Sequence, residues 1–142
     1  MRRVVVTGIG LITPMGQGTE LSWKEILAGK SGAGPITAFD ATDFACRVAC
    51  EVPRIDGRGG GGPDVPGSFD PDKTMSAKDR RRVDDFILYA IAAADEAVRD
   101  AGWTPQDEES RERTGVIIGA GIGGLGPIAD TALEMAEKGP SR

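Results

Sequence analysis

The sequence predicts an α/β fold in which strands and helices alternate along the chain. Three short apolar runs have the composition of buried strands, and each is followed by a stretch with helical spacing; the runs are 3–8, 47–52 and 115–118. Strands that alternate with helices in this way usually pair in a parallel sheet. Three strands leave the edges and faces of such a sheet open, so the pattern describes an incomplete sheet. We therefore expect exposed apolar surface and poor solubility in isolation.

Length and composition are those of a soluble globular domain. The chain has 142 residues, of which 39% are hydrophobic and 27% charged, and its net charge is −5. No run reaches the roughly 18 apolar residues that a membrane span needs, and the first residues lack the apolar core of a signal peptide. These features predict a cytoplasmic protein without a membrane partner. The acidic balance also argues against nucleic acid as a partner.

Few side chains that carry out chemistry are present. The chain has no histidine and two cysteines, Cys46 and Cys50. In an extended segment these two would lie about 13 Å apart, too far for a disulfide, and two cysteines without histidine make a poor zinc site. We therefore predict no metal and expect both cysteines to be small buried or half-buried side chains. Without histidine, catalytic groups would be carboxylates or would lie elsewhere.

Three helices are expected from capping signals and apolar spacing. Thr19 is the predicted N-cap of a helix that ends at Gly29, and Ser76 opens the longest helix, which runs to Gly102. Alanines along one face of the longest helix allow another backbone to approach closely. The last helix is expected over 127–138, before Gly139-Pro140. The segment 54–72, with four consecutive glycines and little to bury, is expected to be a flexible surface excursion.

The glycine-rich run 119–124 allows two explanations at this point. Gly119, Gly121 and Gly124 match a dinucleotide-binding fingerprint between a strand and a helix. The fingerprint also needs an acidic residue about 20 positions on, after the next strand, and the chain has no such strand. A nucleotide-binding α/β module is therefore the weaker alternative. Glycines that permit close packing of the backbone are the other explanation.

Four segments, in order and spacing, resemble the amino-terminal part of a type II β-ketoacyl-acyl-carrier-protein synthase: 3–16, 34–52, 84–103 and 115–126, followed by Gly139-Pro140. The resemblance covers nearly the whole chain, and only the excursion 54–72 is longer than in many relatives. It implies that residues 1–142 form the amino-terminal part of a ketoacyl synthase domain. The complete fold would be a thiolase-like αβαβα sandwich, usually assembled as a homodimer.

The resemblance implies an acyltransferase of fatty acid biosynthesis. The family elongates an acyl chain by a decarboxylating Claisen condensation with malonyl-acyl-carrier protein, and it uses no redox cofactor. A cysteine takes the acyl group and two histidines promote decarboxylation. In the family these residues follow the position of Arg142, and neither Cys46 nor Cys50 matches the catalytic motif. We therefore expect no catalytic residue here and no activity from this chain alone. A chain-length partner subunit of a polyketide synthase, without condensing activity, is the alternative.

Two groups of residues carry over from the family by position. Ile122, between Gly121 and Gly123, matches a residue that lines the acyl channel and limits the length of the acyl chain. A basic patch that docks the acidic acyl carrier protein is matched by Lys78, Arg81, Arg82 and Arg142. Cations near the start of a helix are mildly unfavourable against the helix dipole, so the cluster in the predicted first turn calls for a functional reason. Docking is such a reason, because charge that is complementary to an acidic carrier protein raises the rate of encounter with it.

Overall fold

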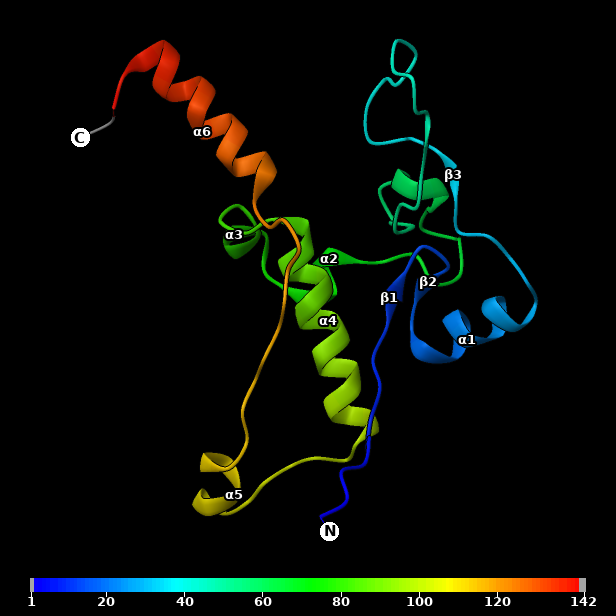
Figure 1. Cartoon of the computed structure of the whole chain (residues 1–142), viewed down its shortest axis with the longest axis vertical. Helices are drawn as coiled ribbons and strands as arrows, with labels where there is room; N and C mark the ends of the chain where they lie inside the picture. The colour runs from blue at the N-terminus through cyan, green and yellow to red at the C-terminus, as the bar shows by residue number, and fades with distance from the viewer. Residues whose placement is uncertain (1, 141–142) are drawn as a thin grey trace.

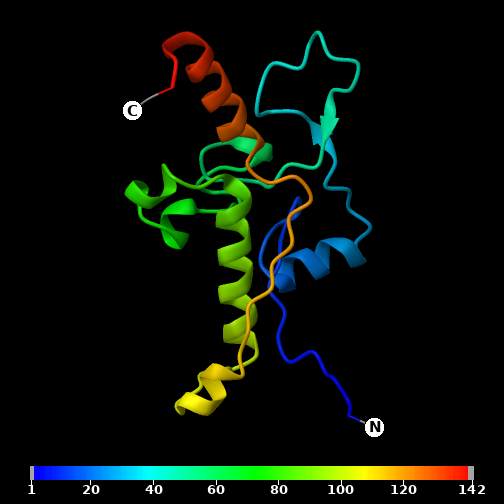
Figure 2. The same ribbon diagram turned by 60° about the vertical axis from the view of Figure 1, so that its left-hand side comes forward.

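A computed structural model describes residues 2–140 of the chain (Figure 1). The central element is the long helix α4, Asp85–Asp100. Two short hairpins and helix α1 lie to one side of it, and helix α6 extends away beyond its amino-terminal end (Figures 1 and 2). No helix among the described residues is long and apolar enough to cross a membrane. The arrangement is open rather than layered, because most elements contact only α4 or their neighbour in sequence.

The secondary structure is mainly helical. The hairpins are β1 (Ile12–Thr13) with β2 (Gly16–Gln17), and β3 (Gly34–Pro35) with β4 (Val48–Ala49), both antiparallel. The helices are α1 (Thr19–Leu27), a 3₁₀ turn (Arg58–Gly60), α2 (Pro71–Thr74), α3 (Ala77–Arg80), α4, α5 (Glu108–Glu112) and α6 (Leu125–Lys138). The predicted parallel sheet is wrong for the described residues, where the single parallel contact is an isolated bridge between Arg54 and Phe69.

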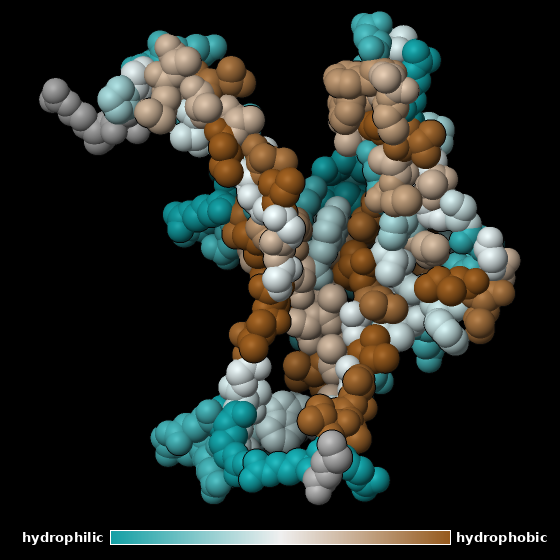
Figure 3. Space-filling view, viewed as in Figure 1, coloured by the Kyte–Doolittle hydropathy of each residue, from teal (hydrophilic) through white to brown (hydrophobic). Residues whose placement is uncertain are grey.

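Two of the three predicted strands are extended segments without a strand partner. Residues 3–8 and 115–118 have no sheet pairing, and Val4 and Ile117 are 97% and 99% exposed. Of the run 47–52, only β4 pairs with another strand. An apolar extended segment becomes a strand only when a neighbour supplies its backbone hydrogen bonds, and these two segments do not supply them to each other. Figure 3 shows hydrophobic side chains along both segments, so the expected exposed apolar surface is confirmed.

The predicted long helix is two helices. Ser76 caps α3 as expected, but the chain turns after Arg80 and Asp84 caps α4 with its own side chain, which accepts a hydrogen bond from the N–H of Asp85. The predicted end at Gly102 is confirmed, since Gly102 has a left-handed φ of 60° and the next N–H donates to Val98 O at 3.2 Å.

Three further helices differ from expectation. Gly18 rather than Thr19 holds the N-cap position of α1, and the Thr19 hydroxyl instead donates to Ile9 O at 3.1 Å. Helix α5, which is not among the three expected helices, begins after Asp107, whose side chain accepts a hydrogen bond from Ser110 N at 2.7 Å. Helix α6 begins two residues earlier than predicted and ends as expected at Gly139.

The core is small and centres on α4. Phe69, Leu88 and Ala92 are buried, with Phe69 fully covered and its ring 5.0 Å from that of Tyr89 in an edge-to-face arrangement. Phe69 and the buried Arg54 belong to the segment 54–72, so the expectation that this segment has little to bury is wrong. The segment is attached to the core at both of these residues.

The amino-terminal segment lies directly on the alanine face of α4. A methyl group on Gly10 would run into Ala93 O, and one on Gly8 would lie 2.8 Å from Ala101 Cβ. The predicted close backbone approach along these alanines is therefore confirmed. Two carboxylates of the helix hold the segment in place: Asp100 accepts from Ile9 N at 2.8 Å, and Glu96 accepts from two backbone N–H groups of the segment and of α1.

Candidate functional site

The predicted acyl-channel residues lie on an exposed loop between α5 and α6. Ile122 is 77% exposed, and no heavy atom lies within 4 Å of a methyl group built on Gly121. Gly123 is different, because such a group would lie 2.8 Å from the ring of Phe86 in the first turn of α4. Close packing of the loop glycines is thus seen at Gly123 and not at Gly121, and the described residues do not enclose Ile122 in a channel.

The predicted docking residues lie together on and just after α3. Lys78, Arg81 and Arg82, here called the docking cluster, are all exposed, and among residues 2–140 none of them has an ion-pair partner. Arg142 lies outside the described residues. Because α3 ends at Arg80, the cations occupy its last turn and the residues after it, where the helix dipole favours positive charge. Since α3 has only four residues, Lys78 also lies in its first turn as predicted, whereas Arg81 and Arg82 follow its end and do not.

Local capping and core contacts position the docking cluster. Ser76 accepts a hydrogen bond from Asp79 N at 3.3 Å and donates to the Asp79 carboxylate at 2.6 Å, which fixes the start of α3. Met75 before α3 and Val83 after it both pack against the core. The turn that carries the three cations is therefore anchored on both sides.

A network of two arginines and two aspartates lies next to the start of α4. Asp85 pairs with Arg54 at 2.7 Å and with Arg58 at 3.1 Å, and Asp56 pairs with the same arginines at 3.3 and 2.8 Å. The hydrogen bond from Arg58 lowers the pKa of Asp56 below its ordinary value, against a smaller opposing effect of burial. Arg54 is only 5% exposed and lies over the ring of Phe69. The network ties the glycine-rich segment to the first turn of α4, and its role is structural.

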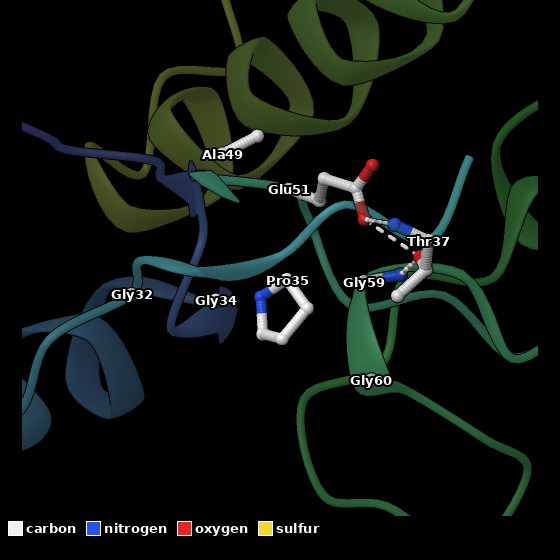
Figure 4. A pocket seen from close by; sticks show the side chains of 8 residues that line it. All are labelled: Gly32, Gly34, Pro35, Thr37, Ala49, Glu51, Gly59 and Gly60. Atoms are coloured by element: carbon white, nitrogen blue, oxygen red, sulfur yellow. Dashed lines mark hydrogen bonds between the residues drawn. The ribbon is translucent and has the colours of Figure 1, made fainter. Parts of the chain in front are cut away.

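A cavity of about 200 Å³ lies between the β3–β4 hairpin and the glycines of the 3₁₀ turn (Figure 4). Glu51 accepts hydrogen bonds there from Thr37 N at 2.9 Å and from the Thr37 hydroxyl at 2.6 Å. That hydroxyl in turn accepts from Gly59 N at 2.7 Å. The hydroxyl bond to Thr37 is the main cause that lowers the pKa of Glu51. Through these bonds Glu51 connects the segment after β3 to the 3₁₀ turn.

The cysteines are free and exposed, so the expectation of buried thiols is wrong. Cys50 directly follows β4, Cys46 lies two residues before it, and the Cys46 thiol donates to Val48 O at 3.4 Å. Among the described residues no group of three or more histidine, cysteine or acidic side chains could hold a metal ion.

Comparison with known proteins gives consistent matches. The family described as beta-ketoacyl synthase, N-terminal domain, matches residues 1–141. A 3-oxoacyl-[acyl-carrier-protein] synthase 2 of Rhizobium meliloti is 46% identical over 142 residues, which are 100% of this chain and 32% of the relative. The protein of the same name from Vibrio cholerae is 43% identical over 99% of this chain and 30% of its own length. A solved structure, the ishigamide ketosynthase/chain length factor, shares 39% identity with a TM-score of 0.55, over 72% of this chain and 22% of that one. This chain spans about a third of the length of the curated relatives it matches.

Proposed function

This chain belongs to the β-ketoacyl synthase family, and we propose that it is the amino-terminal part of a fatty-acid condensing enzyme. The proposed reaction elongates an acyl chain by decarboxylating Claisen condensation with malonyl-acyl-carrier protein. The observation that carries the proposal is a similarity that extends over the whole chain to proteins named 3-oxoacyl-[acyl-carrier-protein] synthase 2. Acyl and malonyl thioesters would be the substrates, in the cytoplasm.

The chain supplies recognition surfaces rather than the reacting groups. It contains no histidine, and its two cysteines are exposed beside a short strand at positions that do not match the family's nucleophile. The catalytic cysteine and histidines are expected in the part of the relatives that this chain does not span. The unpaired segments 3–8 and 115–118 would become strands of a thiolase-like αβαβα sandwich, in a homodimer, once neighbouring strands cover their exposed apolar side chains.

The docking cluster is proposed to bind the acidic acyl carrier protein. Its three cations are exposed, lie within five residues of one another and are free of internal ion pairs among the described residues. Complementary charge of this kind mainly raises the rate of encounter and its dependence on salt. Charge reversal at Arg81 and Arg82 in the natural-length protein should therefore raise the KM for the carrier protein. An unchanged KM would remove the docking proposal and leave the condensing activity standing.

Ile122 is proposed to limit the acyl chain at the end of a channel. The side chain is branched and the glycines on either side leave the backbone bare, so a neighbouring element could approach closely and leave Ile122 as the stop. An Ile122→Ala variant should favour longer acyl chains. A hydrophobic pocket discriminates about 1–3 kcal/mol per methylene, so the preference should shift by about tenfold or more. Product-length profiles measured with acyl donors of graded length test this.

Condensation by the natural-length protein tests the main proposal. We expect 3-oxoacyl product and a covalent acyl-protein detectable by mass, and neither from the 142-residue chain alone. The similarity to a ketosynthase/chain length factor favours one second candidate, a partner subunit that keeps the fold without condensing. That subunit would show no acyl-protein when purified alone. Protection or a rise in Tm on adding NAD or FAD would instead favour the nucleotide-binding alternative.

A further inference from the structure

We infer that an ion pair between Asp72 and Arg80 orients the docking cluster, so that Arg80 is a positioning residue for carrier-protein binding; the inference rests on the proposed docking function. Four of the five residues from Lys78 to Arg82 are cations, but they differ in surroundings. Lys78, Arg81 and Arg82 are exposed, whereas the Arg80 side chain is only 24% exposed and pairs with Asp72. One of the four charges is therefore neutralised within the protein.

The ion pair joins α3 to an element that is fixed on the core. Helix α2 lies against α4, its first residue Pro71 is buried, and Asp70 caps it by accepting a hydrogen bond from Asp72 N at 3.0 Å. Helix α3 has four residues, too few to be stable as an isolated helix. Its remaining side-chain bonds, between Ser76 and Asp79, are local and do not connect it to α2. The Asp72–Arg80 pair is thus the side-chain bond that joins α3 itself to α2, in addition to the core contacts of Met75 and Val83 on either side of α3.

The direction of α3 decides where the docking cluster points. Arg80 faces α2, and because successive helix positions differ by about 100°, Lys78 and Arg81 take other directions, toward solvent. The Nε atom of Arg80 is buried without a hydrogen-bond partner among the described residues, whereas the Asp72 side chain is 66% exposed, so the pair is covered on the arginine side only. A surface held in its binding geometry loses less conformational freedom on association.

The Asp72→Asn variant distinguishes a positioning role of Arg80 from a purely electrostatic effect of the docking cluster. Asp72→Asn adds one positive unit beside the docking cluster and frees Arg80, so a purely electrostatic surface would bind an acidic partner more tightly. A positioning role of Arg80 predicts the opposite, namely that the variant binds the acidic partner more weakly. A partly exposed ion pair contributes on the order of a two- to fivefold change in an equilibrium constant, so we expect Asp72→Asn to raise the Kd for holo acyl carrier protein by about that factor.

The test measures this Kd with the natural-length protein at low ionic strength. Arg80→Gln should weaken binding like Asp72→Asn, and the exchanged pair Asp72→Arg with Arg80→Asp should return the Kd to within about twofold of the original. The matched control is Asp64→Asn, which removes an exposed acid that has no ion-pair partner among residues 2–140. It should leave the Kd unchanged or lower it. An unchanged or lower Kd for Asp72→Asn overturns the inference.

Hydrogen exchange provides a second test, and it is measured without the carrier protein. Asp72→Asn should speed hydrogen exchange at the amides of Arg80 and Arg82, which donate to Ser76 O and Asp79 O at 3.0 Å each. If charge reversal at Arg81 and Arg82 leaves carrier binding unchanged, the docking function fails and the exchange rates alone decide whether Arg80 orients α3. Unchanged exchange would then overturn that role as well.

Discussion

Replacing Glu96 tests how the amino-terminal segment is held on α4. The two oxygens of this half-buried carboxylate accept hydrogen bonds from Leu11 N at 3.0 Å and from Thr19 N at 2.7 Å. One side chain thus joins the start of the first hairpin to the first turn of α1, from 85 and 77 residues away in sequence. Glu96→Ala removes both acceptors and leaves two N–H groups without a partner.

The size of the effect follows from these two bonds. A hydrogen bond to a charged group contributes about 1.5–3 kcal/mol, and half-burial favours the lower part of that range. Glu96→Ala should therefore lower the free energy of unfolding by about 2–4 kcal/mol, or the Tm by roughly 5–15 °C for a chain of this length. Glu96→Gln keeps one acceptor oxygen but loses the charge, so it should fall between Glu96→Ala and the original.

Urea unfolding followed by circular dichroism measures the change, and the adjacent Asp95 provides the control. Asp95 lies on the same helix and makes an exposed pair with Arg99 at 3.1 Å, so Asp95→Asn should cost less than about 1 kcal/mol. Hydrogen exchange at the Leu11 and Thr19 amides should rise in Glu96→Ala and not in Asp95→Asn. Equal destabilisation by the two variants would refute the reasoning, because it would mean that the Glu96 bonds add nothing beyond a surface charge.

Three further variants probe two contacts of α4 and the hydrogen bonds of Glu51. Gly10→Ala puts a methyl group into the backbone of α4 and should destabilise by about 1–3 kcal/mol in urea unfolding, whereas Gly115→Ala, with nothing within 4 Å, should change stability by less than about 0.5 kcal/mol. Asp85→Ala removes the 2.7 Å partner of the buried Arg54; because Asp56 remains, we expect a loss of about 1–3 kcal/mol, and a loss no larger than for an exposed aspartate would contradict this. Glu51 has its pKa lowered in the folded chain, so the unfolded chain takes up this proton first and stability should fall as pH drops below about 4.5. Glu51→Gln should flatten that slope below about pH 4.5 in unfolding at stepped pH, and an unchanged slope would exclude this carboxylate as its source.

Local sequence signals predicted helix ends better than they predicted the sheet. Ser76 as a cap and Gly102 and Gly139 as stops are confirmed, because each acts through its own backbone or side chain within a few residues. The strand predictions were wrong because strand formation depends on contacts that are distant in sequence. Residues 3–8 and 115–118 have strand composition, but pairing depends on another segment, and composition alone does not identify the partner.

The residues that organise the site were missed because their partners are distant in sequence. Arg54 and Glu96 each act on elements far along the chain, and no local pattern marks Arg54 as buried or Glu96 as half-buried. The segment 54–72 was expected to be a loose excursion on account of its glycines, although Phe69 within it becomes the most buried residue of the core. The sequence signal that indicated this burial was Phe69 itself, a large aromatic residue among turn-forming residues.

The first turn of α4 relates the two proposed recognition surfaces. On one side Val83 joins the docking cluster to the core, and on the other the ring of Phe86 contacts Gly123, next to Ile122. Asp85, between them, is held by the buried Arg54. The proposed carrier dock and the proposed channel residue are therefore both adjacent to one short turn that ion pairs brace. A carrier protein bound at the cluster would deliver its acyl chain at a distance from Ile122 that this turn helps to fix, so loss of the brace should affect carrier binding and chain-length preference together.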